Sequence, residues 1–413
     1  MKLMGFNISR KPAEERNFVA QSDPEFLQVI GLQDYMSTAA DVVVNEDTAL
    51  GVPAIFAAVN FIAGTIAGLP LNMFQRSGED RKRVTDTPIA MMLHDAPNDG
   101  LSSFEWRKTF FERVFLAGRG LSFIERKPNG EPVNIWPMDP RRTTIKVNGD
   151  QKSYSYRQMD GKTVQYSASE VVDVPFMLKG DGFSHRSPIT ANRDVIALAI
   201  AATQFGSKFF QNGGVPPFAV TGAFQSGAAM NRASDDIAAA VRKAAKDKRQ
   251  ALVLPAGLDI KPIGADAEKS QLVELKRFCV EEISRIYGLP PVFVQDMTHG
   301  TYSNTEQQDL QLTKHTIKRW VEHFEQEVNL KLFGRGNREF FVEFNMDGLM
   351  RGDFASRMQG HATAIQNGIE TPNEARQVEN KPALPNGDQL LIQGATVPLG
   401  SQPTAPKGGA NGA

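Results

Sequence analysis

The sequence has little that points to export, to disulfide chemistry or to tight binding of nucleic acid. Its 413 residues include a single cysteine, Cys279, so no disulfide can form within the chain and a reducing compartment is expected. The first 16 residues lack the apolar stretch of a secretory signal. The net charge is −1, whereas proteins that bind nucleic acid tightly and non-specifically are usually strongly basic. Any contact with nucleic acid should therefore be weak or confined to a small part of the surface.

Motifs that carry enzyme chemistry are also missing. The sequence contains no GxxxxGK[ST] loop, no GxGxxG after a strand, no HExxH and no GxSxG. Cys279 lies on the apolar side of an expected helix, which favours a packed thiol over a nucleophile. His315 and His323 stand eight residues apart, further than the one-turn spacing that lets two side chains share a metal ion. We therefore expect a protein that is not an enzyme and that needs neither cofactor nor metal.

One uncharged stretch, from Thr48 to Gln75, is long enough to raise the question of a membrane span. It is interrupted by proline, asparagine and several glycines. Four of its residues follow helical spacing, namely Ile55, Val59, Ile62 and Ile66. This pattern favours a buried core helix, and a membrane-anchored protein remains the alternative.

The first half of the chain predicts an α+β region at residues 49–187, preceded by a polar, partly flexible arm at residues 1–48. The length of the whole chain suggests that it contains more than one compact region. The elements expected in this region are a helix at 54–68, a strand at 70–75, a charged turn at 77–83, a helix at 103–116 capped by Ser102 or Ser103, and short strands between 121 and 176. Asn-Gly and Asp-Gly turns between these strands indicate an antiparallel sheet.

The second half predicts long helices around a small insert. Ser187-Pro188 should open a helix that runs to about residue 212, and a second helix from about Asp266 should end at Gly288. Between them, residues 214–265 indicate a small strand–helix–strand module whose helix should span about 234–248. Further along we expect a capping box at Ser303-x-x-Glu306, a third long helix ending at Gly334, a strand at 339–344, helices near 353–366 and from 372, and a disordered tail at 393–413.

The segment from Gly288 to Phe333 strongly resembles the portal proteins of long-tailed bacteriophages. That family shows a Gly-Leu-Pro-Pro-like stop, a short loop and then Tyr-Ser-Asn-x-Glu-Gln at the start of a long helix. The residues here are Tyr302, Ser303, Asn304, Glu306 and Gln307. Three further stretches agree with the family: Ala57–Asn60 with Leu69–Leu71, Ser187–Ile189 with Lys208–Gly213, and Arg351–Asp353 with Asn373, Glu374, Arg376, Gly387 and Asp388. Arg186 replaces the family's usual glycine, which affects only the local turn.

The resemblance covers about residues 50–390 and implies a multi-region α+β fold assembled as a ring. By similarity the regions are the wing at 49–187, stem helices at 188–213 and 266–290, the clip at 214–265, a tunnel loop at 291–303, a long wing helix and strand at 304–350, and a helical crown at 351–392. The residues expected to line the DNA channel are Asp296, Met297, Thr298, His299, Gly300, Thr301, Tyr302, Ser303 and Asn304.

The function that this resemblance implies is that of a head–tail connector in the virion. Such a ring, usually a homododecamer, forms the DNA channel at one capsid vertex for genome packaging and DNA ejection, and it assembles in the host cytoplasm. The expected partners are other copies of the chain, double-stranded DNA held non-specifically, the terminase large subunit, the major capsid protein or scaffold, and head–tail connector or adaptor proteins, with no membrane.

The basic cluster in the clip is the second group of candidate contact residues. It comprises Arg242, Lys243, Lys246, Lys248 and Arg249. A solvated helix face is the favoured interpretation of such a cluster, and contact with terminase or DNA is the alternative. The same fold could also serve a defective prophage or a gene transfer agent. A nuclease or protease is disfavoured because no cluster of acids or nucleophiles is present in the sequence.

Overall fold

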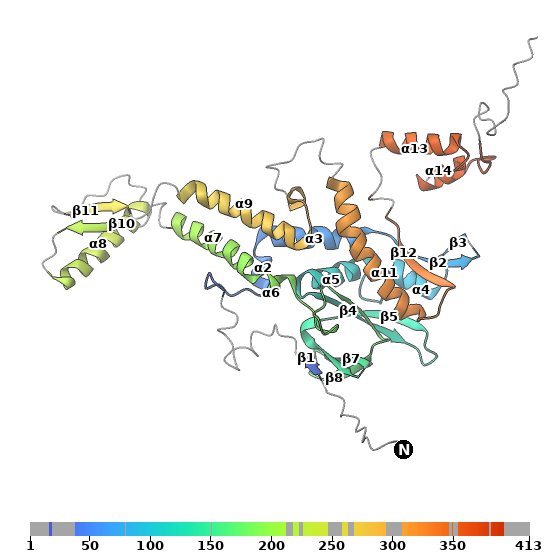
Figure 1. The fold of residues 1–413 in the computed structure, drawn as a ribbon, viewed down its shortest axis with the longest axis horizontal. Coiled ribbons are helices and arrows are strands. Elements are labelled where there is room, and N and C mark those ends of the chain that lie inside the picture. The colour runs from blue at the N-terminus through green and yellow to red at the C-terminus, as the bar shows by residue number, and fades with distance from the viewer. Residues whose placement is uncertain are drawn as a thin grey trace, which may run out of the picture. The chain divides into compact units, whose positions relative to one another are not determined.

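The structure is a computed structural model that describes residues 16–18, 38–78, 80–149, 151–211, 218–222, 226–246, 258–262, 268–294, 308–346, 349, 354–379 and 381–391. The chain divides into two compact units, residues 1–345 and 346–413. Helices and strands both make up the first unit (Figure 1), and the expected α+β class is confirmed.

The first unit begins with helices and sheets that alternate along the chain. Its elements as far as residue 175 are β1 (Arg16–Phe18), α2 (Glu46–Leu50), α3 (Pro53–Gly68), β2 (Leu71–Ser77), β3 (Asp80–Val84), α4 (Pro88–His94), α5 (Ser103–Leu116), β4 (Arg119–Arg126), β5 (Pro132–Met138), the 3-10 turn η2 (Pro140–Arg142), β6 (Thr143–Asn148), β7 (Gln151–Arg157), β8 (Thr163–Ser167) and β9 (Val171–Pro175).

Helices dominate the rest of the chain. The first unit continues with α6 (Pro188–Ala191), α7 (Arg193–Gln211), β10 (Phe218–Gly222), α8 (Gly227–Lys246), β11 (Leu258–Pro262), α9 (Glu268–Tyr287), η3 (Pro291–Val294), the π-helical η4 (Leu312–Ile317), α11 (Lys318–Phe333) and β12 (Phe340–Phe344). The second unit contains α13 (Phe354–Gln366) and α14 (Pro372–Val378), and an ion pair between Arg357 and Glu379 joins the two helical segments.

Four antiparallel sheets are present among the described residues. Their strand orders are β12-β2-β3, β5-β4-β9, β1-β6-β7-β8 and β10-β11. The first sheet pairs β2 with a strand from the far end of the unit, so that Leu71 lies opposite Phe344. The register of β4 with β9 places Leu121 opposite Asp173. Segments distant in the sequence are therefore tied together at the centre of this unit.

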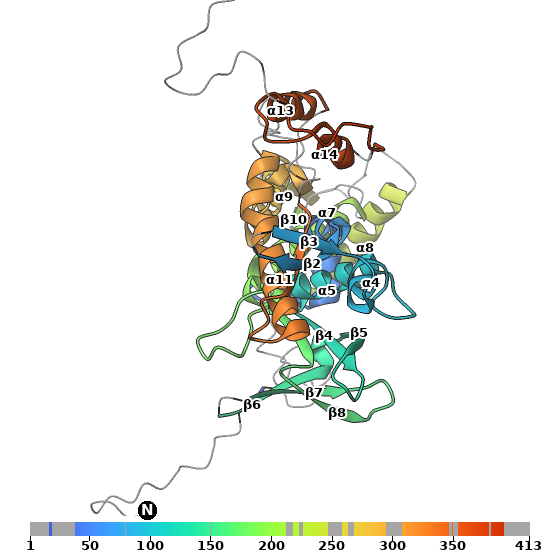
Figure 2. The same ribbon diagram turned by 90° about the vertical axis from the view of Figure 1, so that its right-hand side faces the viewer.

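The core lies between α3, α5 and α11 (Figures 1 and 2). Phe324 of α11 is fully buried, and the centroid of its ring lies 5.2 Å from that of Phe110 and 5.4 Å from that of Phe111 in α5. Its ring also lies 5.8 Å from Trp106 and 5.8 Å from Phe344. Large aromatic side chains bury much apolar surface and favour such tilted and edge-to-face contacts. This cluster therefore fixes α5 and α11 against strand β12.

Helix α3 is the uncharged stretch that raised the question of a membrane. Its four residues at helical spacing, from Ile55 to Ile66, are all buried, and at most 2% of the surface of each residue is exposed to solvent. Contacts with α5 and α9 cover this side of the helix, while Phe56 on the other side is exposed. Among the described helices, none has both the length and the apolar character needed to span a bilayer. The expected core helix is confirmed.

Several expectations about local structure were wrong. The charged turn at 77–83 is largely strand β3, paired with β2 in a hairpin. The helix expected at 188–212 is broken at Asn192, whose side-chain amide donates to the carbonyl of Pro188. The helix of the insert begins at Gly227, not near 234. The strands between 121 and 176 form parts of two sheets, not one. Helix α4 was not predicted at all.

Gly118 follows the last turn of α5 and allows the chain to enter β4. Its φ is +82°, a left-handed conformation that favours glycine. A Cβ atom at this position would lie 2.5 Å from the Cα of Ser187 and 2.8 Å from the carbonyl oxygen of Arg186. Both neighbours are backbone atoms, so they could move aside only by displacing the start of α6.

We predict that Gly118→Ala destabilises the first unit strongly. A Cβ in the left-handed region costs about 1–2 kcal/mol by itself, and the clash with Ser187 adds to it. Gly130→Ala is the matched control because Gly130 has a φ of +86° and open space around it. Urea unfolding followed by tryptophan fluorescence should show a free energy of unfolding at least ~2 kcal/mol lower for the first variant than for the control. Equal losses would contradict the close approach to Ser187.

Candidate functional site: a helix pair held by the end of α5

A buried ion cluster lies under the loop that leads into the helix pair. Asp173 of β9 accepts two hydrogen bonds from the guanidinium of Arg119, from Nε to Oδ1 at 2.5 Å and from Nη2 to Oδ2 at 2.8 Å. Lys152 and Tyr154 of β7 also donate to Oδ2 of Asp173. The side chains of Arg119 and Asp173 are only 1% and 2% exposed. The cluster therefore joins two different sheets through one carboxylate.

The charge on Asp173 is stabilised by its neighbours. Burial alone would raise the pKa of this carboxyl, but the charges of Arg119 and Lys152 and their hydrogen bonds outweigh burial and hold the pKa well below its usual range. Burial lowers the pKa of Lys152, and its contact with Asp173 opposes that shift. Glu327 of α11 accepts a hydrogen bond from the backbone N–H of Asp173 at 3.2 Å. Helix α11 is thus tied to the same strand.

The loop between β9 and α6 is anchored to this cluster. Arg119 Nη1 donates to the carbonyl of Phe183 at 2.7 Å and lies 3.5 Å from Nδ1 of His185. The other ring nitrogen of His185, Nε2, lies 3.1 Å from the carbonyl oxygen of Ala117. Because an arginine can only donate, Nδ1 acts as the acceptor and Nε2 carries the proton. Burial lowers the pKa of His185 to about 4, in agreement with a neutral ring.

The last carbonyl groups of α5 hold both helices of the pair. Ser187 caps α6 and its hydroxyl donates to the carbonyl of Leu116 at 2.7 Å. Tyr287, at the end of α9, donates from its hydroxyl to the carbonyl of Phe115 at 3.2 Å. Terminal carbonyls have no partner within their own helix. Here they accept from Ser187, His185 and Tyr287, so α6–α7 and α9 are both anchored at one point.

Helices α7 and α9 pack side by side through small residues on α7 (Figure 1). Ala199, Ala202 and Gly206 are buried on α7, and an added Cβ on Gly206 would lie 3.6 Å from Leu272 of α9. Small side chains allow the two helices to approach closely. Cys279 and Ile283 of α9 are buried on the expected apolar stripe. Burial also raises the pKa of the Cys279 thiol, as expected for a packed side chain.

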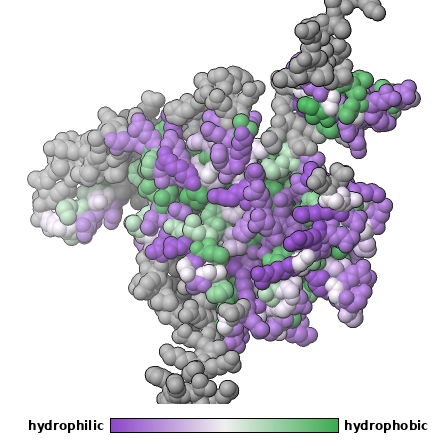
Figure 3. All heavy atoms as spheres, turned by 45° about the vertical axis from the view of Figure 1, so that its right-hand side comes forward, coloured by the Kyte–Doolittle hydropathy of each residue, from purple (hydrophilic) through white to green (hydrophobic). Residues whose placement is uncertain are grey.

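Each helix of the pair also presents large apolar side chains to solvent. Leu198 and Phe205 on α7 are 36% and 47% exposed, and they lie two turns apart on one side of the helix. Val273 and Phe278 on α9 are 52% and 49% exposed. In Figure 3 hydrophobic residues reach the surface beside the helix pair, while the face over the sheets is mostly hydrophilic.

The described residues that follow α9, 288–294, are held in place near both of their ends. Gly288, with a φ of +67°, ends α9 as expected, and its carbonyl accepts a hydrogen bond from Thr316 of η4 at 2.5 Å. Phe293 of η3 stacks on Phe61 of α3 with the ring centroids 5.2 Å apart. The expected channel-lining residues 296–304 and the expected capping box at Ser303 and Glu306 lie outside the described residues.

The small insert contains the expected strands and helix. Strands β10 and β11 pair in antiparallel register, with Phe218 opposite Pro262. Arg242, Lys243 and Lys246 of the basic cluster lie on α8, while Lys248 and Arg249 are outside the described residues. The structure therefore brings three members of the cluster onto one helix.

No group of three or more potential metal ligands occurs among the residues that the structure describes. Sequence reasoning missed the ion cluster around Asp173, although one signal for it was present. An aspartate in the otherwise apolar strand Val171–Pro175 must be buried, and a buried carboxylate needs a partner. Nothing in the sequence identifies Arg119 and Lys152 as those partners, because they come from other strands.

Comparisons with known proteins agree on one family. The family model described as "Phage portal protein" matches residues 53–380. The portal protein of Enterobacteria phage HK97 is 26% identical over 367 residues, which cover 87% of this chain and 85% of that protein. The probable portal protein of Streptomyces phage phiC31 is 30% identical over 364 residues, with coverages of 84% and 79%. A solved neck of a native gene transfer agent particle, computed with C12 symmetry, contains a chain of similar fold, with a TM-score of 0.54, 18% identity and coverages of 81% and 91%.

We predict that Asp173→Asn lowers the free energy of unfolding of the first unit by about 3 kcal/mol or more. The change removes the negative charge and leaves Arg119 and Lys152 without their common partner, and breaking one side of a buried pair typically costs about 3–5 kcal/mol. Asp160→Asn is the control, because Asp160 pairs with Lys162 at an exposed turn, where ion pairs contribute little. Urea unfolding of both variants tests this prediction.

The effect should also depend on pH in one direction. Because the folded pKa of Asp173 lies below its ordinary value of 3.8, its ionised form contributes stability that is complete above about pH 4. That contribution is lost as the pH falls below 4 toward the folded pKa. The difference between wild type and Asp173→Asn should therefore be constant from pH 5 to pH 7 and shrink below pH 4. A difference that grows on acidification would contradict the ionised state.

Proposed function

The chain belongs to the phage portal protein family, and we propose on that basis that it is one subunit of the ring through which DNA enters and leaves a capsid. The two portal relatives compared above come from phages, and each is matched over more than three quarters of its own length. The fold of the chain is also that of a subunit in a neck with C12 symmetry. A closed ring of twelve copies is the assembly that this likeness supports.

The observation that carries this proposal is the pair α7 and α9 with aromatic side chains left in solvent. Phe205 and Phe278 are each about half exposed in the single subunit. In a closed ring, neighbouring copies cover such faces with one another. Twelve helices at a spacing of ~10 Å form a circle of radius about 19 Å. Subtracting ~5 Å for half a helix leaves a bore of about 28 Å, which admits a DNA duplex.

The net charge of −1 fits a channel that DNA must slide through. Each phosphate that a protein neutralises adds salt-dependent affinity. A strongly basic channel would hold the DNA and oppose its movement. Residues 296–304 contain one acid, one histidine, a glycine and small polar residues, and we propose that this loop touches the DNA backbone without gripping it.

The remaining partners follow from the role of a portal. The chain carries no nucleotide-binding motif, so the energy for packaging must come from a separate motor, and we propose that a terminase large subunit docks on the insert 214–265. The basic residues of α8 are candidate contacts for it. Capsid protein or scaffold and the tail-connector proteins are proposed as the other neighbours of the ring. In this role the chain is a structural component of a virion and not an enzyme.

A portal of a defective prophage or of a gene transfer agent is the second candidate. The fold that this chain shares with a chain in the neck of a gene transfer agent supports this second candidate. Both candidates require the same ring, and sequencing the DNA carried by purified particles separates them. A phage carries its own genome, whereas a gene transfer agent carries fragments of host DNA.

We predict that the double variant Phe205→Asp and Phe278→Asp folds but fails to form rings. Each carboxylate would have to be buried between copies without a partner, which is strongly unfavourable. Native mass spectrometry and negative-stain microscopy of the purified protein should show subunits in place of rings, with the fraction in rings reduced at least about tenfold.

Met159→Asp is the matched control for that experiment. Met159 is 90% exposed on the turn between β7 and β8, so the substitution adds one such carboxylate, where the double variant adds two, at an apolar surface position away from the helix pair. The control should form rings as the wild type does. Intact rings in the double variant would refute the assignment of α7 and α9 as the contact surface, and a wild-type chain that never forms rings would refute the portal proposal itself.

We also predict that deleting Asp296–Thr301 leaves ring assembly intact and impairs packaging or retention of DNA. The deletion removes the proposed contact with the DNA backbone, while Gly288 and Phe293, which lie between α9 and the deleted residues, keep their contacts with Thr316 and Phe61. Replacing the same six residues by glycine and serine is the control for loop length. The DNA content of particles, measured by quantitative PCR after nuclease treatment, gives the readout. Normal DNA content after the deletion would exclude a role for this loop.

A further inference from the structure

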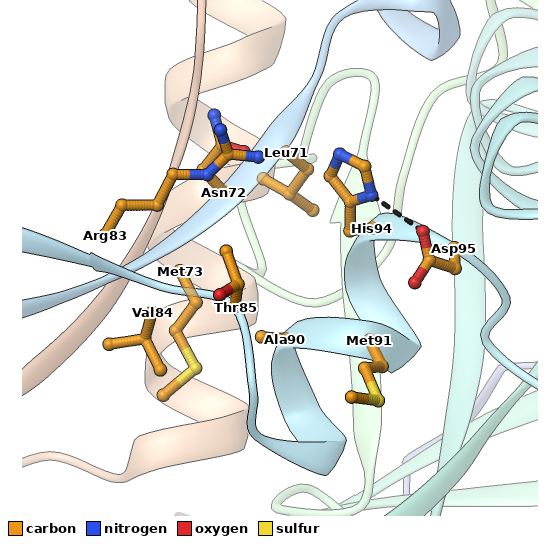
Figure 4. Close-up of a pocket in the computed structure, with 10 residues that line it drawn as sticks. All are labelled: Leu71, Asn72, Met73, Arg83, Val84, Thr85, Ala90, Met91, His94 and Asp95. Carbon is orange, nitrogen blue, oxygen red and sulfur yellow. Dashed lines mark hydrogen bonds and ion pairs between the residues drawn. The ribbon is translucent and has the colours of Figure 1, made fainter.

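A pocket outside the helix pair lies between the hairpin β2–β3 and helix α4 (Figure 4). It encloses about 230 Å³. Its apolar lining consists of Leu71, Met73, Val84, Ala90 and Met91. Asn72 of β2, Arg83 of β3 and Thr85, just after β3, supply polar groups, and His94 and Asp95 supply them from the end of α4. Pockets that take whole small molecules usually enclose about 300–1,000 Å³. This pocket is therefore of a size for one inserted side chain.

Asn72 gives the pocket an unused hydrogen-bonding group. Only 7% of this residue is exposed, and its side-chain oxygen Oδ1 is buried with no hydrogen-bond partner. Buried polar groups are nearly always hydrogen-bonded, because leaving one unmatched opposes folding. An amide that lines a pocket without a partner in the subunit is suited to a group that arrives from outside. A peptide N–H is one donor that would satisfy it.

The strand beside the pocket has a free edge. β3 is the last strand of the sheet β12-β2-β3, and no other strand among those described pairs with its outer side (Figures 1 and 2). Unpaired strand edges present backbone donors and acceptors at regular spacing and are a common place for an extended peptide to bind. The pocket at the end of β3 would then receive one side chain of that peptide.

The charge on this edge favours an acidic partner. Arg81 of β3 is paired with Glu343 at 2.5 Å and lies over the ring of Phe74. Lys82 and Arg83 are exposed and have no acidic partner among the described residues. His94, at the other side of the pocket, is already paired with Asp95 at 2.8 Å. Arg83 is thus the cation available to a carboxylate next to the pocket.

We propose that the β3 edge and this pocket bind an extended segment of another protein in which an apolar residue adjoins an acidic one. The apolar side chain enters the pocket against Met73 and Met91, a backbone N–H of the segment donates to Asn72, and the acidic side chain pairs with Arg83. Each of the three groups of the pocket is matched by one group of the segment. The inference concerns the single subunit and does not depend on ring formation.

The test starts with a library of displayed random peptides of about twelve residues, from which those that bind the purified full-length chain are selected. The selected peptides should be enriched in Asp or Glu next to Leu, Ile, Val, Met or Phe. Fluorescence anisotropy with a synthetic copy of the most enriched peptide then gives its affinity. Arg83→Glu should weaken binding about tenfold or more, because it turns an attraction into a repulsion. Arg157→Glu, the same charge change at the exposed last residue of β7, should leave the affinity unchanged.

A second variant separates binding from folding. Asn72→Leu removes the unmatched amide at nearly constant volume, so the melting temperature should stay the same or rise while the affinity for the peptide falls about fivefold or more. A lower melting temperature with unchanged affinity would show that Asn72 serves the fold alone and would overturn the proposal. Selection without an acidic bias, no enriched peptide at all, or displacement of the peptide by an equal concentration of duplex DNA would overturn it as well.

Discussion

Three consecutive carbonyl groups at the end of α5 are the constraint on which the rest of the first unit depends. The carbonyls of Phe115, Leu116 and Ala117 accept from Tyr287, Ser187 and His185, which belong to the two ends of the helix pair and to the loop before it. Helix α5 is in turn held by its buried aromatic side chains, above all against Phe324. Because the last turn of any helix lacks partners for its carbonyls, this end would be costly to bury alone. Burying it against the helix pair satisfies the carbonyls and fixes the direction in which α7 and α9 leave the core.

The ion cluster around Asp173 also stabilises the junction between the end of α5 and the helix pair. A carboxylate that is 2% exposed is tolerated only because Arg119, Lys152 and Tyr154 all donate to it. Such a cluster adds little net stability compared with well-packed apolar residues, but it works in only one geometry. It requires β4, β7 and β9 to meet in a fixed register, and through Phe183 and His185 it requires the loop before α6 to follow one path. Its contribution is therefore to the position of the helix pair more than to the free energy of folding.

The sequence predicted those parts of this arrangement that local patterns determine. Turn residues marked most strands, Ser102 and Ser187 marked helix starts, and Gly288 and Gly334 marked helix ends. Some failures come from local interactions that the residue pattern does not reveal, and others come from contacts between distant segments. The charged residues 80–84 form a strand because β2 offers them a partner, and the helix after Ser187 breaks where the side chain of Asn192 bonds back to Pro188. The ion cluster joins residues up to 54 positions apart, and no spacing in the sequence reveals it. The channel segment proposed at 296–304 was predicted only from resemblance to a family, and it lies outside the residues that the structure describes.

In the proposed ring, one pair of helices has to meet two opposite requirements. Contacts between copies must be strong, and contacts with DNA must be weak enough for it to move. Apolar side chains suit the first requirement, because the hydrophobic effect depends on buried area and is not weakened by salt in the way that ion pairs are. The exposed side chains of Phe205 and Phe278 can provide such contacts. Binding to phosphates, in contrast, grows with every cation placed near them. In the ring that we propose, a chain with a net charge of −1 and with aromatic groups on its helix pair would separate the two demands by chemistry: apolar surface would close the ring, and the lack of excess positive charge would leave the DNA free to pass.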